Sequence, residues 1–246
     1  MAVALLLPVM KKTTTILAIG SGLFLSQAQA EIESEFHVGY NSQYIFRGVD
    51  LGDDAYEYGL DFAGSCECGL DWSAGIWGIS PDNEDGNIDE LDFYAAVSKD
   101  FGGVTVAVGY TAYTYDSSVV ASDDAEVFIG FSGAIAGFDA GATFYFGTDG
   151  VLQEQVLMEL SLGYAHTISD TATANLGLTY GYVLDEGQGG YASSDGSAYF
   201  TATLGVDFAL SDEITFSPYF SYVDGKSRIG GVDGETFGGA MLSFAF

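Results

Sequence analysis

Hydrophobic and polar side chains alternate with a period of two along most of the chain after residue 30. Between Ala172 and Tyr182, alanine, leucine and tyrosine occupy the even positions, while threonine, asparagine and glycine occupy the odd ones. Successive side chains of a β-strand point to opposite faces, so the pattern predicts a strand with one apolar and one wet face. A helix would need apolar residues every three to four positions, and that spacing is absent.

The same alternation recurs along the chain and predicts about twelve strands. Their clearest parts cover residues 36–44, 56–62, 70–76, 91–97, 104–110, 127–131, 138–146, 156–164, 172–182, 198–208, 214–222 and 242–246. Pro218 lies inside one of these segments and cannot donate a backbone hydrogen bond, so we expect a bulge or a local break there.

The connections between the expected strands alternate in length. Short turns are expected at Ser65–Gly69, Asp100–Gly103, Ala134–Gly137, His166–Thr171 and Ala209–Glu213. Longer acidic segments are expected at Gly48–Asp54, Ser80–Ile88, Asp116–Asp124, Gly147–Gln153, Val183–Ser194 and Val223–Asp233. An even strand number with this alternation is typical of bacterial outer-membrane proteins. We therefore predict an all-β fold, a closed antiparallel transmembrane β-barrel with short periplasmic turns and longer acidic outer loops. A soluble β-sandwich is the alternative.

The N-terminus has the pattern of a secretory signal peptide. Lys11 and Lys12 precede an apolar stretch from Ile16 to Leu25, and Ala28-Gln29-Ala30 has the small-x-small pattern of a cleavage site. The apolar stretch is too short to span a bilayer as a helix. We expect residues 1–30 to be removed, with Met10 as an alternative start of translation, and residues 31–246 to form a single barrel domain in the outer membrane.

The composition excludes some classes of partner and fold. The full sequence has 35 acidic and six basic residues, a formal net charge of −29, and two of the six basic residues lie in the segment expected to be removed. Such a chain would repel phosphate, so no nucleic acid is expected as a partner. A hydrophobic content of 48% and an aromatic content of 15% also argue against a disordered acidic chain.

Aromatic residues gather where strands are expected to meet a membrane boundary. Tyrosines cluster at 110–115, 180–182 and 219–222, which favours an interfacial girdle over simple strand propensity. At the C-terminus, Leu242, Phe244 and Phe246 share one face, and this ending resembles the assembly signal of outer-membrane barrels. The expected partners are therefore outer-membrane lipid, lipopolysaccharide and the barrel-assembly machinery.

Three motifs in the first half of the chain resemble one family. The run Asn41-Ser42-Gln43-Tyr44-Ile45-Phe46-Arg47-Gly48-Val49, the strand Ala74-Gly75-Ile76-Trp77-Gly78-Ile79-Ser80 and the strand Glu90-Leu91-Asp92-Phe93-Tyr94 occur in the order of the Gcw_chp family, also called the TorF family of porins. The resemblance covers roughly residues 38–98. It implies an outer-membrane, porin-like barrel, and it supplies no catalytic residues and no substrate.

Residues that could carry chemistry are few. The two histidines, His37 and His166, both map to the expected periplasmic end, so an outer-membrane enzyme is disfavoured, and we predict no catalytic residue and no cofactor. Asn83, Asp85 and Asp92 have the spacing of a calcium loop, but Pro81 stands at the first ligand position and no helices flank the segment. A solvated acidic loop, or weak divalent binding that bridges to lipopolysaccharide, remains open. The role of Cys66 and Cys68 stays open between three alternatives, which are incidental turn residues, a local disulfide and a functional pair.

The inward face of the barrel is the candidate functional surface. A charge that faces lipid is costly, so the phase of the alternation assigns ten polar residues to the interior. These candidate pore-lining residues are Gln43, Arg47, Glu57, Asp61, Asp71, Glu90, Asp92, Glu126, Glu159 and Asp207. Arg47 is the lone base among them and should pair with one or more of the acids. We expect passive diffusion of small, preferentially cationic or neutral solutes, with a closed structural or adhesive barrel as the alternative.

Overall fold

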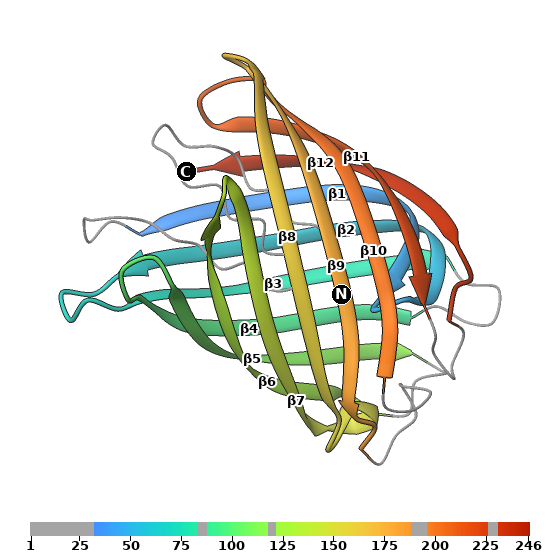
Figure 1. The fold of residues 1–246 in the computed structure, drawn as a ribbon. Helices are drawn as coiled ribbons and strands as arrows, with labels where there is room; N and C mark the ends of the chain where they lie inside the picture. The colour runs from blue at the N-terminus through green and yellow to red at the C-terminus, as the bar shows by residue number, and fades with distance from the viewer. Residues whose placement is uncertain (1–31, 83–87, 118–121, 188–195, 226–230) are drawn as a thin grey trace.

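The protein is a closed barrel of twelve antiparallel strands, seen in a computed structural model (Figure 1). The structure describes residues 32–82, 88–117, 122–187, 196–225 and 231–246. The strands are β1 (Glu33–Phe46), β2 (Val49–Ser65), β3 (Asp71–Asp82), β4 (Ile88–Asp100), β5 (Thr105–Ser117), β6 (Asp124–Ile135), β7 (Phe138–Asp149), β8 (Val156–Ser169), β9 (Ala172–Asp185), β10 (Gly196–Ala209), β11 (Ile214–Gly225) and β12 (Glu235–Ala245), with a 3₁₀ turn, η1 (Gly150–Leu152), between β7 and β8. The expected fold class and strand number are confirmed.

Each strand pairs with its neighbours along the chain, and β1 closes the ring against β12. The register of this closing pair runs from Glu35 opposite Ala245 to Asn41 opposite Gly239. No helix among the described residues is both long and apolar enough to cross a lipid bilayer. The expected signal segment, residues 1–30, lies outside the described residues and stays a prediction.

The wall has the two faces that the alternation predicted. In β9 the odd positions from Asn175 to Val183 are buried, and Leu176 and Tyr180 on the even positions are exposed. Across the barrel many large apolar and aromatic side chains are exposed, while many serine, threonine and carboxylate side chains are buried. The polar face therefore lines the interior, and the apolar face lies outside.

The chain passes between strands in two ways at the two ends of the barrel. Five short turns, together with the start of β1 and the end of β12, lie at one end, called here the turn end. The turn between β2 and β3 contains a disulfide between Cys66 and Cys68, whose Cα atoms are 5.1 Å apart, so the local disulfide is the alternative that the structure contains. The opposite end, called the loop end, holds the longer connections, four of which include residues outside the described ranges.

Pro218 interrupts only one of the two ladders of β11. Its pairing with Ala240 of β12 keeps the regular register. Toward β10, the ladder passes from Gly205–Tyr219 to Phe208–Phe216 without pairs in between, and then continues in the same register. The expected local break is therefore present, and no bulge accompanies it.

One expected loop is wrong. Residues 49–54, assigned to a long acidic segment at Gly48–Asp54, belong to β2, and β1 joins β2 through Arg47 and Gly48 alone. Both residues have positive φ, 50° and 80°, which a two-residue type I′ hairpin requires. The acidic residues of this segment give it the composition of a loop. Its backbone nevertheless pairs with β1, so the segment belongs to a strand.

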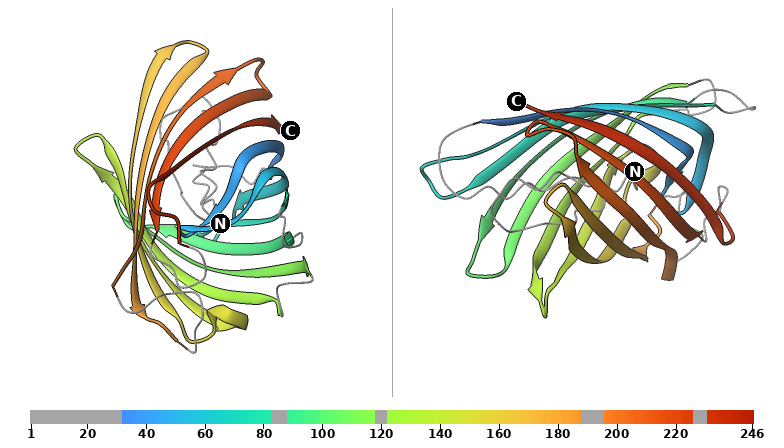
Figure 2. Two further views of the ribbon diagram at one scale, coloured as in Figure 1. Left: turned by 90° about the vertical axis from the view of Figure 1, so that its right-hand side faces the viewer. Right: turned by 90° about the horizontal axis from the view of Figure 1, so that it is seen from above.

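The tip of this hairpin leaves the wall and enters the barrel. Beyond Asn41 the pairing of β1 with β12 stops, and the β1–β2 ladder shifts register between Tyr44 and Ile45. Every residue from Tyr44 to Val49 is buried, so both faces of the tip are covered by protein. Figure 2 shows the bent β1–β2 hairpin against the other strands. We call residues 42–54 the inner hairpin.

Replacing Gly48 with alanine is expected to destabilise the barrel because the inner hairpin has no space for a side chain at its tip. A Cβ there would lie 2.7 Å from Tyr199 Cβ and 2.8 Å from Gly225 Cα. Gly102 is a matched control, since its φ of 84° is similar and a Cβ would meet nothing within 4 Å. Both alanines carry left-handed strain of about 1–2 kcal/mol. Overpacking should lower the free energy of unfolding of Gly48→Ala by a further ~1–3 kcal/mol. Urea unfolding in liposomes measures the free energy of unfolding of both variants. Equal decreases in the two variants would contradict tight packing around Gly48.

Candidate functional site: the acidic interior and the inner hairpin

Eight of the ten candidate pore-lining residues lie on the inner side of the wall, and Gln43 and Arg47 lie on the inner hairpin. Gln43 and Asp71 are partly buried, and the other eight are buried. Those eight are Arg47, Glu57, Asp61, Glu90, Asp92, Glu126, Glu159 and Asp207. Seven of these eight are carboxylates, and one is an arginine. Of the two Lys and Arg residues that the structure describes, only Arg47 is inside, because Lys99 is exposed and lies over the Phe101 ring.

Aromatic donors hold most of these carboxylates in place. Tyr44 donates to Glu90 and Tyr113 donates to Glu126, each at 2.6 Å. Tyr145 donates to Glu159 at 3.0 Å. The remaining donors are Tyr199, which also binds Glu159, Tyr94, which binds Asp61, and Trp77, which donates to Glu57. A buried carboxylate without such partners would lose its hydration without compensation, so the donors stabilise the fixed negative charges.

Some of the tyrosines expected in the interfacial girdle instead lie inside the barrel. Tyr110, Tyr180 and Tyr222 are exposed on the outer face, as a girdle requires. Tyr113 is buried, and Tyr219 donates to Asn41 inside the barrel. The signal was present in the alternation: in Phe144-Tyr145-Phe146 the two phenylalanines face out, so the tyrosine between them must face in.

Arg47 lies at the turn of the inner hairpin and forms the expected ion pairs across the interior. Its two terminal nitrogens lie 2.9 Å and 2.7 Å from the two carboxylate oxygens of Glu126 on β6, and its Nε lies 3.6 Å from Glu159 Oε1 on β8. The guanidinium also lies 4.4 Å from the ring centroid of Tyr145. A bidentate pair that also stacks on an aromatic ring is the geometry that arginine provides and lysine does not.

Apolar contacts hold the inner hairpin on both of its sides. On one side, Tyr44 and Phe46 pack in a cluster with Trp77 of β3, Tyr113 of β5 and Leu152 of η1. On the other side, Ile45 packs with Val223 of β11, with Phe237 of β12 and with Val232 in the connection between these two strands. The hairpin therefore spans the interior near the loop end. Tyr44 shares the phase of the outward residues of β1, but it is buried because the hairpin tip is covered by protein on both faces.

The remaining candidates are less constrained by the structure. Asn83 and Asp85 of the calcium-like segment lie outside the described residues, and Asp92 lies inside the barrel on β4, beyond the loop. Asp124, expected in an acidic loop, is buried at the start of β6 and accepts from the backbone nitrogen of Val151. His166 is exposed near the end of β8, and His37 is fully buried on β1.

Replacing Arg47 with alanine is expected to lower the free energy of unfolding by about 3 kcal/mol, because it leaves Glu126 buried without its cation. Arg47→Lys should recover only part of this loss, since an ammonium cannot form the bidentate pair. Lys99→Ala, which removes an exposed base, should change stability by less than about 0.5 kcal/mol. Denaturant titration of the three refolded variants measures the differences, and an Arg47→Ala barrel as stable as the wild type would place Arg47 in solvent.

The N-terminal part of the chain matches a known family. Residues 26–125 match the sequence model of the family described as "Bacterial protein of unknown function (Gcw_chp)". The matched region contains the inner hairpin, Arg47 and strands β1 to β5. No curated protein matches the sequence well enough to count as a relative.

Several solved structures with a similar fold are outer-membrane channels and porins. An outer membrane channel from Pseudomonas putida F1 has a TM-score of 0.56 at 7% identity, with 89% of this chain and 97% of that chain covered. The NanC porin has a TM-score of 0.53 at 14% identity, covering 86% of this chain and 98% of the porin. The KdgM porin has a TM-score of 0.51 at 11% identity, covering 86% and 99%. At these identities the likeness concerns the fold. The resemblance expected from the three motifs is thus confirmed, and the chain combines a Gcw_chp sequence over residues 26–125 with the barrel fold of outer-membrane porins.

Proposed function

We propose that this protein is an outer-membrane channel that passes small cationic or neutral solutes through an acidic interior narrowed by the inner hairpin. The observation that carries the proposal is the excess of buried carboxylates over buried bases inside the barrel. A purely structural barrel has no need for so many buried acids, five of which accept a hydrogen bond from a tyrosine or tryptophan, balanced by one arginine. Two of the similar structures are named porins and a third is named a channel, which supports the same assignment.

The outer surface supports a location in a lipid bilayer. Large apolar side chains on the outer face are exposed, among them Phe93, Val108, Leu160 and Leu204. In water such a surface would drive aggregation, whereas hydrocarbon removes that cost. A closed ring of strands also leaves no unpaired edge, which is the condition for a β-sheet in lipid. Export by the predicted signal peptide and insertion by the barrel-assembly machinery would deliver the chain to the outer membrane, where lipopolysaccharide is its neighbour.

The fixed charges favour cations over anions. Carboxylates that line a narrow, partly dehydrated passage attract cations and repel anions, as acidic rings do in cation channels. Arg47 neutralises at most one charge of the Glu126–Glu159 pair. Charges at the loop end act from a greater distance, and at about 0.15 M salt the Debye length is roughly 8 Å, so they contribute less.

A barrel without transport is a second candidate, and one observation favours it. The inner hairpin packs against β3, β5, β11 and β12 at once, so it fills much of the interior near the loop end. In that case the protein would be a structural or adhesive barrel. Electrical recording distinguishes the two candidates, because only a channel gives ionic current.

The location is tested with two exposed aromatic residues at the turn end. Phe246 is 71% exposed and Phe101 is 66% exposed, but only Phe246 belongs to the predicted assembly signal. Phe246→Ala keeps the backbone contacts with Ser34 and should lower the amount of heat-modifiable protein in the outer-membrane fraction severalfold. Phe101→Ala should not. A soluble periplasmic wild type would exclude the membrane location, and equal levels of both variants would exclude the assembly signal.

Selectivity is tested by neutralising carboxylates in two places. Asp92 and Glu57 are buried inside the barrel, whereas Asp116 and Asp233 are exposed near the loop end. In a potassium chloride gradient across a planar bilayer, the wild type should show a cation-selective reversal potential. Asp92→Asn with Glu57→Gln should move that potential toward zero more than Asp116→Asn with Asp233→Asn, which removes the same charge. An anion-selective wild type would refute the charge argument, and a barrel without current would favour the structural alternative.

A further inference from the structure

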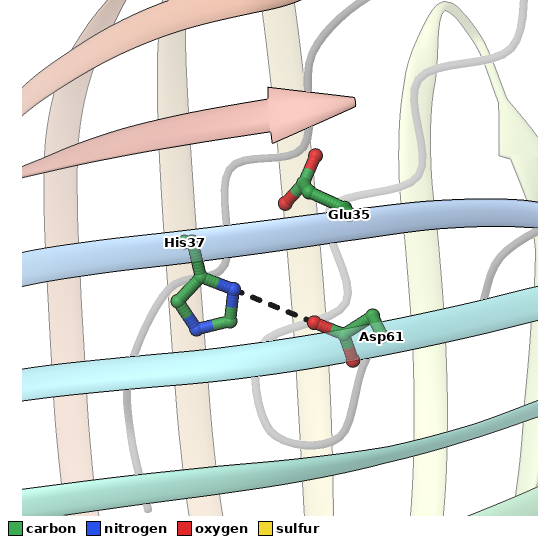
Figure 3. A group of neighbouring side chains, drawn as sticks. All are labelled: Glu35, His37 and Asp61. Atoms are coloured by element: carbon green, nitrogen blue, oxygen red, sulfur yellow. Dashed lines mark ion pairs between the residues drawn. The ribbon is translucent and has the colours of Figure 1, made fainter. Parts of the chain in front are cut away.

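A histidine and two carboxylates meet inside the barrel near the turn end. Glu35 and His37 lie on β1, two residues apart, and Asp61 lies on β2 directly opposite Glu35 in the strand register. Figure 3 shows His37 and Asp61 pointing toward each other, with the Glu35 carboxylate beside them. One side-chain ligand atom from each residue can be chosen so that all three lie within 4.8 Å of one another.

The three side chains are buried, yet four of their polar atoms lack hydrogen-bond partners. Their exposures are 6% for Glu35, 0% for His37 and 3% for Asp61. Glu35 Oε1, Asp61 Oδ2 and both ring nitrogens of His37 make no hydrogen bond. Four buried polar atoms without hydrogen bonds destabilise the fold, because each has lost its hydration. Their arrangement points to a ligand that accepts electron pairs from all three residues.

An ion pair between His37 and Asp61 explains only part of this arrangement. His37 Nδ1 lies 3.4 Å from Asp61 Oδ2, so a protonated imidazole would compensate one carboxylate. Glu35 Oε1 and the second ring nitrogen would still have no partner. Neither Arg47, which pairs with Glu126, nor the exposed Lys99 supplies the missing charge, and these are the Lys and Arg residues that the structure describes.

We propose that Glu35, His37 and Asp61 bind a divalent transition-metal ion, with zinc as the best fit. One imidazole nitrogen and two carboxylate oxygens are ligands that zinc accepts, and a water molecule would complete four-coordination. A tetrahedral zinc ion with bonds of about 2.0–2.2 Å holds its ligand atoms roughly 3.3–3.6 Å apart. The 3.4 Å between His37 Nδ1 and Asp61 Oδ2 matches this separation. The proposal is independent of whether the barrel conducts.

Neighbouring residues prepare the site for a metal. Tyr94 donates to Asp61 Oδ1, which orients the carboxylate and leaves Oδ2 free for an ion. Such outer contacts position the ligands of many metal sites. Gly59 lies opposite His37, and a Cβ there would approach the imidazole Cε1 to 2.3 Å, so only glycine leaves room for the ring in this orientation.

Isothermal titration of the metal-free, refolded full-length barrel with zinc chloride tests the proposal. The wild type should bind one zinc ion per barrel at this site. His37→Ala, Asp61→Asn and Glu35→Gln should each weaken this binding at least about tenfold. His166→Ala, which removes the exposed histidine, and Asp124→Asn, which removes a buried carboxylate at the loop end, should bind as the wild type does. Heat-modifiable gel mobility establishes that each variant is folded before titration.

Two results would overturn the assignment. The first is a wild type without a stoichiometric zinc site, or one whose site survives unchanged in folded Asp61→Asn and His37→Ala barrels. The second comes from X-ray absorption of the zinc-loaded wild type, which needs no variant. The spectrum should show one imidazole nitrogen among oxygen ligands. Coordination by oxygen alone would assign the ion to surface carboxylates and would exclude His37 from binding.

Discussion

Closure of the sheet is the constraint on which the rest of this structure depends. A strand in lipid must pair its backbone groups on both sides, so β1 has to meet β12 along the part of the barrel that faces hydrocarbon. That contact runs from Glu35 to Asn41 and no further. Beyond Asn41 β1 no longer pairs with β12, and β1 and β2 pair with each other, while Gly48 O at the tip accepts from Val232 N. The inner hairpin is therefore a consequence of where the pairing between β1 and β12 ends.

The interior shows how buried charge is tolerated. Its carboxylates lie beside tyrosine hydroxyls, an indole and one guanidinium, so most of them receive a hydrogen bond in place of water. Arg47 adopts a left-handed backbone conformation that arginine rarely takes. Strain of this kind persists where surrounding contacts compensate for it, and here the compensation comes from Glu126, Glu159 and the Tyr145 ring. The turn, the ion pair and the packing of the hairpin support one another.

Much of the wall could be predicted from local alternation, and the inner hairpin could not. In β9 the contrast between leucine and threonine positions sets the face of every residue. In residues 49–54 the acidic side chains and glycine have the composition of a loop, and only pairing with β1 makes them a strand. Tyr44 and Tyr113 were given the wrong face because tyrosine suits both a membrane boundary and a buried hydrogen bond. The partners of Arg47 and the grouping of Glu35, His37 and Asp61 depend on cross-strand register, which a sequence pattern does not specify.

The partners of the inner hairpin also impose an order of events on folding. Arg47 is made early in the chain, but its carboxylates come from β6 and β8, and Ile45 packs against residues of β11 and β12. Contacts between such distant segments form only after the chain has paid the entropy of bringing them together. Arg47 therefore gains its ion-pair partners only after β6 and β8 have joined the sheet. Once the last strand joins, the finished ring encloses the tip, and a barrel that lacks β11 and β12 would lose the contacts of Ile45 on one side of it.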